Sequence, residues 1–109
     1  MKHKSIVTEY TEISAMSGEP AEQWHHLIWG DNGAKRAKAD EDQLILPLTS
    51  KEHTIGPVTE RIHGNPAAEK LSKFVGQLAW EKEYYKKQAK ADGDPARDEF
   101  RKRYGKSYL

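Results

Sequence analysis

Four histidines in this chain have spacings that could support metal chemistry. His25 and His26 are adjacent in the run EQWHHLIWGDNG, and His53 and His63 lie ten residues apart further along. Three imidazoles that converge on one divalent cation and leave a position open make a hydrolytic site, because the metal stabilises charge on a phosphate oxygen. A fourth histidine could then activate water, since its pKa lies near neutral pH.

The spacing alone leaves a second interpretation open. The chain has no tight metal motif such as H-E-x-x-H, and histidines on a small polar domain can be scattered, partly exposed side chains. The elements that would position the four imidazoles therefore decide whether they can meet.

Two short strands are predicted on either side of a polar segment. Residues 22–29 are apolar and aromatic and end at the turn GDNG, which predicts a strand. Residues 44–48 (LILPL) predict a buried strand in which Pro47 marks an edge or an end. Alternation along the first strand would place His25 and His26 on opposite faces. The following segment could bring the two later histidines back toward this strand.

The rest of the chain predicts less sheet and more helix. Residues 4–14 are expected to form a short strand, and the polar residues 34–43 a loop. A helix is expected from Pro66 to about Lys90, with Asn65 as its N-cap and the turn DGDP (92–95) after it. Its apolar residues fall on one face: Ala67, Leu71, Phe74, Leu78 and Tyr85. A last helix starts at Asp94 and Pro95 and carries Phe100 and Tyr104 on one face.

The length predicts a single domain, and the order of the expected elements, strands first and helices after them, makes it a small α+β domain with a helical C-terminal half. The chain has 109 residues, 32% of them charged, and a net charge of +1, which is not the balance of a strongly basic nucleic-acid binder. No apolar run approaches the roughly 18 residues of a membrane span, and the first residues do not read as a secretory signal. We therefore expect a cytoplasmic protein. Cysteine is absent, which excludes disulfides and thiolate ligands.

Four sequence blocks carry a resemblance to a known family. They are HHLIWG, LILPLTSKEH, VTERIHGNP and the C-terminal FRKRYGKSYL, which follow one another in this order. Together they resemble the HNH (His-Me finger) endonucleases, and most closely the small forms carried by bacteriophages and prophages. The resemblance implies a single HNH-like domain over residues 1–109. Its ββα-metal, treble-clef-like core would cover about residues 6–90, with a C-terminal helix and tail at about 94–109.

The resemblance also assigns roles to the histidines. His26 matches the general base that accepts a proton from the attacking water, and His25, His53 and His63 match metal ligands. The implied cofactor is one divalent ion (Mg²⁺, Mn²⁺, Ni²⁺ or Zn²⁺), and the implied activity is metal-dependent hydrolysis of DNA. The alternative is an HNH-like fold without useful turnover that binds DNA or a protein. A third possibility is a purely structural zinc at His25 and His26.

The sequence departs from the family pattern at two places. Where many relatives carry two Cys-x-x-Cys pairs, this chain has Thr8-x-x-Thr11 and Thr49-x-x-Glu52, so no structural cysteine–zinc site is expected. Packing and hydrogen bonds must hold the strands instead. The candidates for this packing are Trp24, Trp29, Trp80, Tyr84 and Tyr85. The family's middle asparagine, which orients the base, has no match: Gln43 and Asn32 lie near its place.

Basic residues near the histidine turn are the candidate DNA contacts. Lys35, Arg36 and Lys38 follow this turn, and the resemblance makes Arg36 the best candidate for a backbone contact. A second basic cluster lies on the last helix and tail: Arg97, Arg101, Lys102, Arg103 and Lys106. Either cluster could equally be solvated surface. The expected partners are DNA and other phage or host proteins of recombination, replication or packaging.

Overall fold

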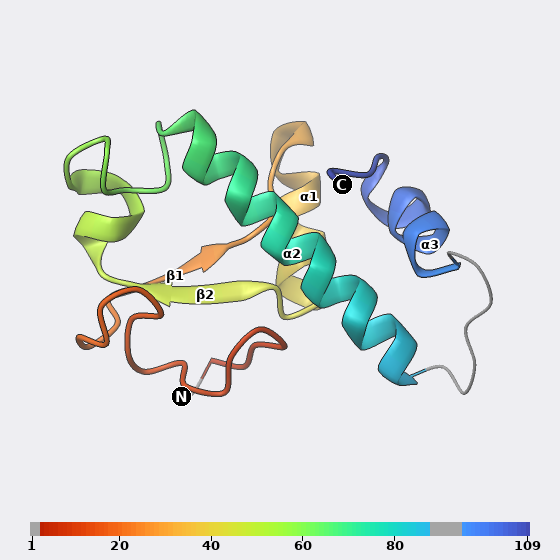
Figure 1. The fold of residues 1–109 in the computed structure, drawn as a ribbon, viewed down its shortest axis with the longest axis horizontal. Helices are drawn as coiled ribbons and strands as arrows, with labels where there is room; N and C mark the ends of the chain where they lie inside the picture. The colour runs from red at the N-terminus through yellow and green to blue at the C-terminus, as the bar shows by residue number, and fades with distance from the viewer. Residues whose placement is uncertain (1–2, 88–94) are drawn as a thin grey trace.

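The protein has a mixed α and β architecture, as expected from its sequence. The computed structural model describes residues 3–87 and 95–109. Its elements are, in order, β1 (Gln23–His26), a 3-10 turn η1 (Asp31–Gly33), α1 (Ala34–Glu41), β2 (Ile45–Leu48), a short π-helical turn η2 (Lys51–Ile55), α2 (Pro66–Lys87) and α3 (Pro95–Tyr104) (Figure 1). The predicted end of the long helix at Lys90 and most of the DGDP turn, including Asp94, lie outside the described residues.

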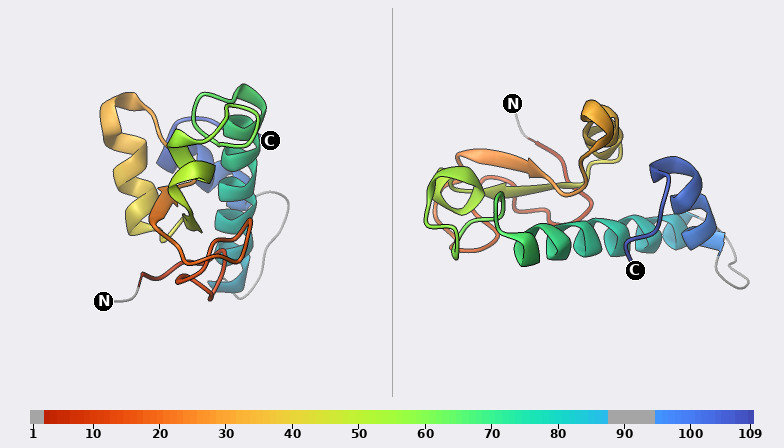
Figure 2. Two further views of the ribbon diagram at one scale, coloured as in Figure 1. Left: turned by 90° about the vertical axis from the view of Figure 1, so that its left-hand side faces the viewer. Right: turned by 90° about the horizontal axis from the view of Figure 1, so that it is seen from above.

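The two strands form an antiparallel pair in which His25 faces inward. Trp24 lies opposite Pro47, and His25 opposite Leu46. His25 is only 1% exposed, whereas its neighbour His26 is partly exposed, so the predicted alternation of the two histidines is confirmed. Helices α1 and α2 lie on opposite sides of the strands (Figure 2).

Helix α2 turns a small and polar face toward the strands, not its apolar face. Leu71 is 61% exposed and Leu78 is 55% exposed. The buried residues of α2 are Ser72, Gly76, Gln77 and Glu81. A Cβ at Gly76 would lie 2.9 Å from Cγ1 of Ile28, so this glycine allows α2 to approach the segment after β1. The N-cap is confirmed, because the amide of Ala68 donates to Oδ1 of Asn65 at 3.2 Å.

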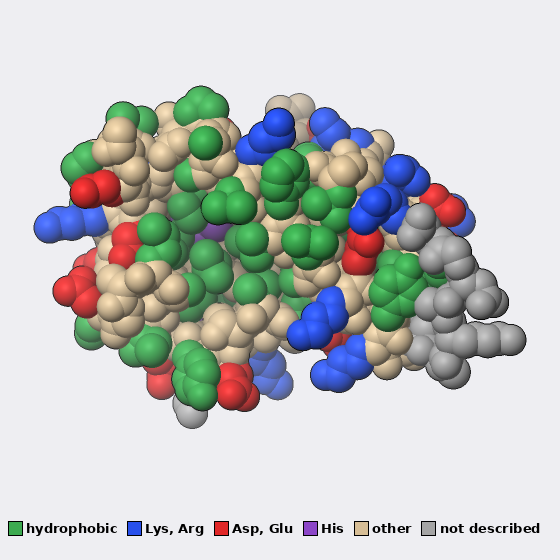
Figure 3. All heavy atoms as spheres, viewed as in Figure 1, with side chains coloured by type: hydrophobic (Ala, Val, Ile, Leu, Met, Phe, Trp, Pro, Cys, Tyr) green, Lys and Arg blue, Asp and Glu red, His purple; other side chains and the backbone are tan. Residues whose placement is uncertain are grey.

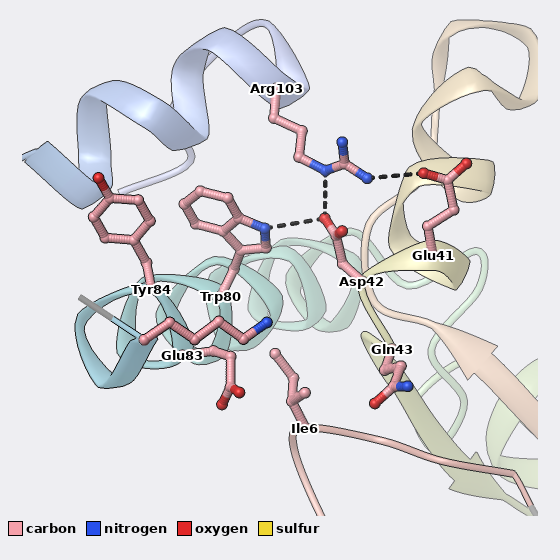
Figure 4. A pocket seen from close by; sticks show the side chains of 9 residues that line it. Ile6, Glu41, Asp42, Gln43, Trp80, Glu83, Tyr84 and Arg103 are labelled. Atoms are coloured by element: carbon pink, nitrogen blue, oxygen red, sulfur yellow. Dashed lines mark hydrogen bonds and ion pairs between the residues drawn. The ribbon is translucent and has the colours of Figure 1, made fainter.

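The core is small and joins α1, α3 and the ends of the strands. Its buried members are Leu27, Ile28, Ala39, Leu44, Phe100 and Tyr104. The predicted buried face of the last helix is therefore confirmed. Beside this core, Oδ2 of Asp42 accepts hydrogen bonds from Trp80 (3.0 Å), Arg103 (2.6 Å) and Tyr104 (2.7 Å). Figure 4 shows the carboxylate of Asp42 between Trp80 on α2 and Arg103 on α3, so one side chain links three helical segments.

Two predicted elements differ from the structure. Residues 34–43 contain helix α1 instead of a loop; only Ala39 is buried in it, so the segment lacks an apolar period although Ala, Lys, Arg and Glu favour helix. Residues 4–14 do not form a strand. Their polar groups reach the second strand singly, as in the hydrogen bond from Ser5 Oγ to the carbonyl of Ile45 (2.7 Å). Among the described residues, no helix is long and apolar enough to cross a membrane.

Candidate metal centre

Three of the predicted histidines meet at one place. The ring centroids of His25 and His53 are 5.0 Å apart, those of His25 and His63 are 5.0 Å apart, and those of His53 and His63 are 4.6 Å apart. One ring nitrogen from each lies within 4.8 Å of the other two. The chain has no cysteine, so imidazoles are the donors available here. These three side chains could hold a metal ion.

Backbone hydrogen bonds hold the two later histidines side by side. The amide of His63 donates to the carbonyl of His53 at 3.1 Å, and the amide of Ile62 donates to the carbonyl of Glu52 at 2.8 Å. Arg61 closes the intervening loop, since its guanidinium donates to the carbonyls of Gly56 (2.9 Å) and His63 (2.7 Å). The ten-residue loop therefore returns His63 to η2, as its length had suggested.

The tautomer of His25 follows from its contact with α2. The hydroxyl of Ser72 donates to the carbonyl of Leu27 at 2.9 Å, so its oxygen is left to accept from His25 Nε2 at 2.8 Å. Nε2 then carries the proton and Nδ1 carries a lone pair. This Nδ1 is buried and has no hydrogen-bond partner within the part of the chain that the structure describes. An orphaned buried acceptor on a ring whose centroid lies 5.0 Å from two other imidazoles fits a metal ligand.

His53 and His63 also lie near polar side chains that do not belong to the group of three histidines. Nδ1 of His53 lies 2.6 Å from the side-chain oxygen of Gln23, which accepts a hydrogen bond and leaves Nε2 as the free nitrogen. Nδ1 of His63 lies 4.0 Å from a carboxylate oxygen of Glu69. Hydrogen bonds such as those of His25 and His53 orient metal-binding imidazoles and raise their basicity. The contact of His63 with Glu69 is too long to be a hydrogen bond.

The site keeps its imidazoles neutral, which metal binding requires. Burial, with smaller effects from the neighbouring histidines, lowers the pKa of His25 to about 3. Burial and the charge of His63 lower the pKa of His53 to about 4. Burial also lowers the pKa of His63, against the opposing effect of Glu69. All three rings are therefore unprotonated near neutral pH, and their lone pairs are available to a cation.

A pocket opens onto these histidines and includes the predicted base. It has a volume of about 200 Å³ and is lined by Trp24, His25, His26, Trp29, Arg36, His53 and His63. Histidine surface is visible on the face shown in Figure 3, so at least one of the chain's histidines is open to solvent from that side. Trp29 packs edge-on against His25 (5.3 Å) and His63 (4.9 Å), which makes the lining largely apolar.

His26 lies in this pocket but outside the group of three possible ligands. Its Nε2 is 3.0 Å from a carboxylate oxygen of Asp40 on α1, a residue whose side chain is 72% exposed. Asp40 therefore lies beside His26, where a residue that orients this histidine would be needed. For that role the sequence had offered only Gln43 and Asn32. Gln43 lines a different pocket, and Asn32 is exposed with a left-handed backbone (φ 54°).

The basic residues predicted as DNA contacts are not equally placed. Arg36 is exposed and lines the histidine pocket. Lys35 lies 3.4 Å from Asp31 and is only 12% exposed, and Lys38 donates to the carbonyl of Arg103 at 2.8 Å. Neither lysine lines the pocket. In the second basic cluster, four of the five residues pair with carboxylates: Arg97 with Glu81, Arg101 with Asp98, Lys102 with Glu99, and Arg103 with Glu41 and Asp42.

Hydrogen bonds join Thr49 and Glu52, the two residues that the resemblance matches to one of the cysteine pairs. The carboxylate of Glu52 accepts from the hydroxyl of Ser14 (2.5 Å) and from the amide of Thr49 (2.9 Å). Although burial raises it, these hydrogen bonds hold the pKa of Glu52 below its ordinary value. Trp24 also donates to the carbonyl of Thr11 at 2.7 Å. Hydrogen bonds thus attach the N-terminal segment to β1 and η2.

Sequence reasoning missed the outer partners of the histidines. Ser72 lies 47 residues from His25, and Asp40 lies 14 residues from His26. Asp40 is the first of three consecutive acidic residues before the predicted second strand, and nothing in the sequence singles it out from Glu41 and Asp42. Ser72 gave no local signal, because a serine inside an amphipathic helix reads as surface.

Neither the protein-family models, nor the curated proteins, nor the solved structures contain a match to this chain.

Proposed function

We propose that this chain is a metal-dependent DNA endonuclease of the HNH (His-Me finger) type. The observation that carries the proposal is the convergence of His25, His53 and His63, with an orphaned Nδ1 on His25, beside a fourth histidine in the same pocket. Three ligands that leave a coordination position open, together with a separate base, suffice for metal-assisted hydrolysis of a phosphodiester.

The proposal includes a ββα-metal core made of β1, β2 and α2. Strand β1 supplies His25 and the base, and η2, directly after β2, supplies His53. Helix α2 supplies Ser72, which sets the tautomer of His25. This arrangement supports the resemblance because β1, the turn η2 that follows β2, and α2 each contribute a group to one centre.

In the proposed reaction, a bound divalent ion would stabilise negative charge on the scissile phosphate and on the leaving 3′ oxygen. His26 accepts a proton from the attacking water. Because Asp40 accepts from Nε2 of His26, the proton of the neutral ring resides on Nε2, and Nδ1 is the nitrogen that takes up the water proton. The P–O3′ bond breaks, and solvent returns a proton to the 3′ oxygen. Arg36 on the pocket wall binds a neighbouring phosphate oxygen.

The donor set favours some metals over others. Imidazole nitrogen suits Zn²⁺ and Ni²⁺, whereas Mg²⁺ prefers oxygen ligands. We therefore expect tighter binding of Zn²⁺ and Ni²⁺ than of Mg²⁺ at the three histidines.

The test is cleavage of supercoiled plasmid with Mg²⁺, Mn²⁺, Ni²⁺ or Zn²⁺, with EDTA as the blank. The wild type is expected to nick with at least one metal. His26→Ala is expected to lose at least a hundredfold in rate, the usual contribution of a general base, yet to bind metal by calorimetry. His53→Ala is expected to lose both nicking and metal binding.

His3→Gln is the matched control, because His3 is outside the possible ligand group and stacks on Trp24. It should nick like the wild type. If His26→Ala nicks as fast as the wild type, His26 is not the base. If no metal supports cleavage while metal still binds, the centre is structural and the chain is a binding module.

A further inference from the structure

Three lysines surround the ring of Tyr108 near the C-terminus. The ammonium groups of Lys35, Lys73 and Lys106 lie 5.9, 5.6 and 5.3 Å from the centroid of this ring. They come from α1, α2 and the C-terminal segment. Lys and Arg side chains gather over this part of the face in Figure 3, above α2 and around the C-terminal segment.

Hydrogen bonds hold the segment that carries Tyr108 against helix α2. The amide of Tyr108 donates to the side-chain oxygen of Gln77 at 2.6 Å, and the amide group of Gln77 donates to Ser107 at 2.9 Å. Gln77 is fully buried on α2, so these bonds fix the C-terminal segment against that helix. The position of Tyr108 among the three lysines is therefore set by buried contacts.

The charge of this cluster is only partly balanced. Lys35 is paired with Asp31 at 3.4 Å. Within residues 3–87 and 95–109, no carboxylate pairs with Lys73 or Lys106. A bound anion would balance the positive charge that Lys73 and Lys106 bring to this ring. The chemistry of the cluster thus suits a phosphate oxyanion.

One indole ring connects the cluster to the candidate metal centre. The ammonium of Lys73 lies 4.6 Å from the ring of Trp29, and that ring packs at 4.9 Å against His63. A strand whose scissile phosphate lay at the histidines would therefore carry a further phosphate past Trp29 toward the lysines. A nucleic acid presents charges at such short intervals along one strand.

We infer that Lys73 and Lys106, supported by Lys35, bind a backbone phosphate of the nucleic-acid strand whose neighbouring phosphate enters the histidine pocket. The position of this site relative to the cleaved bond rests on the proposed function. The rings of Tyr108 and Trp29 form the apolar surface along which the strand passes from one phosphate to the other. Because the contact is to the backbone, the site binds without sequence preference.

The test is binding of fluorescein-labelled oligonucleotides, single-stranded and duplex, measured by anisotropy in EDTA so that no strand is cut. The double variant Lys73→Gln, Lys106→Gln is expected to bind roughly tenfold more weakly at low salt. The slope of log K against log salt should fall by about 0.7 to 0.9 for the lost phosphate contact. Lys70→Gln is the matched control: it is on the same helix, over the ring of Phe74 at 6.0 Å, and should bind like the wild type.

The outcomes separate this site from the proposed catalysis. If the wild type nicks plasmid and the double variant binds and nicks equally well, the lysine site is wrong and the nuclease proposal stands. If no metal supports nicking but binding falls in the double variant alone, the lysine site stands and the nuclease proposal fails. An unchanged salt slope with reduced affinity overturns the phosphate contact itself.

Discussion

Ser72→Ala tests the reasoning about the metal centre most directly. The hydroxyl of Ser72 is buried, accepts from His25 Nε2 at 2.8 Å and donates to the carbonyl of Leu27 at 2.9 Å. Alanine keeps the shape of the helix face and removes both bonds. It leaves a buried N–H and a buried carbonyl without partners.

The expected losses are of two kinds. One unsatisfied buried polar group costs about 1–3 kcal/mol of stability, so Ser72→Ala should lower the free energy of unfolding by about 2–4 kcal/mol for the two groups, allowing for partial relaxation. The imidazole of His25 also loses the contact that holds its tautomer and orientation. Removal of such a partner typically weakens metal binding by about 10–100-fold.

The assay is urea denaturation combined with calorimetric titration of Zn²⁺ and Ni²⁺. Ser14→Ala is the matched control, because Ser14 is also buried but its hydroxyl bonds to Glu52 instead of to an imidazole. This control should lose stability and keep its metal affinity. If Ser72→Ala loses stability but binds both metals as tightly as the wild type, Ser72 is only structural. The tautomer argument for His25 would then be refuted.

Three further outcomes are expected. Saturation with Zn²⁺ at about 100 times its dissociation constant should stabilise the fold by about 2.7 kcal/mol, seen as a rise in Tm that EDTA reverses; an unchanged Tm would contradict binding to the folded state. Asp42→Asn should lower the unfolding free energy by about 1–3 kcal/mol in urea, because Arg103 and Tyr104 lose a charged acceptor, and should leave metal affinity unchanged. Gly76→Ala should destabilise by about 1 kcal/mol despite the helix propensity of alanine, because its Cβ would lie 2.9 Å from Ile28; a more stable variant would show that this contact is soft.

The parts of the fold that local sequence signals specify were predicted well. Strand β1 (Gln23–His26) lies inside the predicted span 22–29 but covers only half of it, whereas α2 begins at Pro66 after an N-cap, where the pattern places it. The spacing of Phe100 and Tyr104 likewise gave the buried face of α3. These signals act within a few residues and need no tertiary information.

The errors lie where tertiary contacts override local pattern. Leu71 and Leu78 form an apolar row, yet α2 docks through the polar row that carries Ser72, since that row can bond to His25 and to the C-terminal segment. Helix α1 was missed because Ala39 alone reaches the core. The spacing drew attention to the histidines and the resemblance gave them roles, but their hydrogen-bond partners come from segments far along the chain.

The polar face of α2 links the candidate chemistry to folding. Ser72 and Gln77 are both buried there, one bonded to His25 and the other to the C-terminal segment that carries Tyr108. Buried polar groups stabilise a fold only when every member has a partner, and His25 Nδ1 has none within the described residues. A cation at this nitrogen would remove that deficit. Binding of such a cation would therefore be coupled to stability through one helix, and that helix also positions Lys73 beside Trp29.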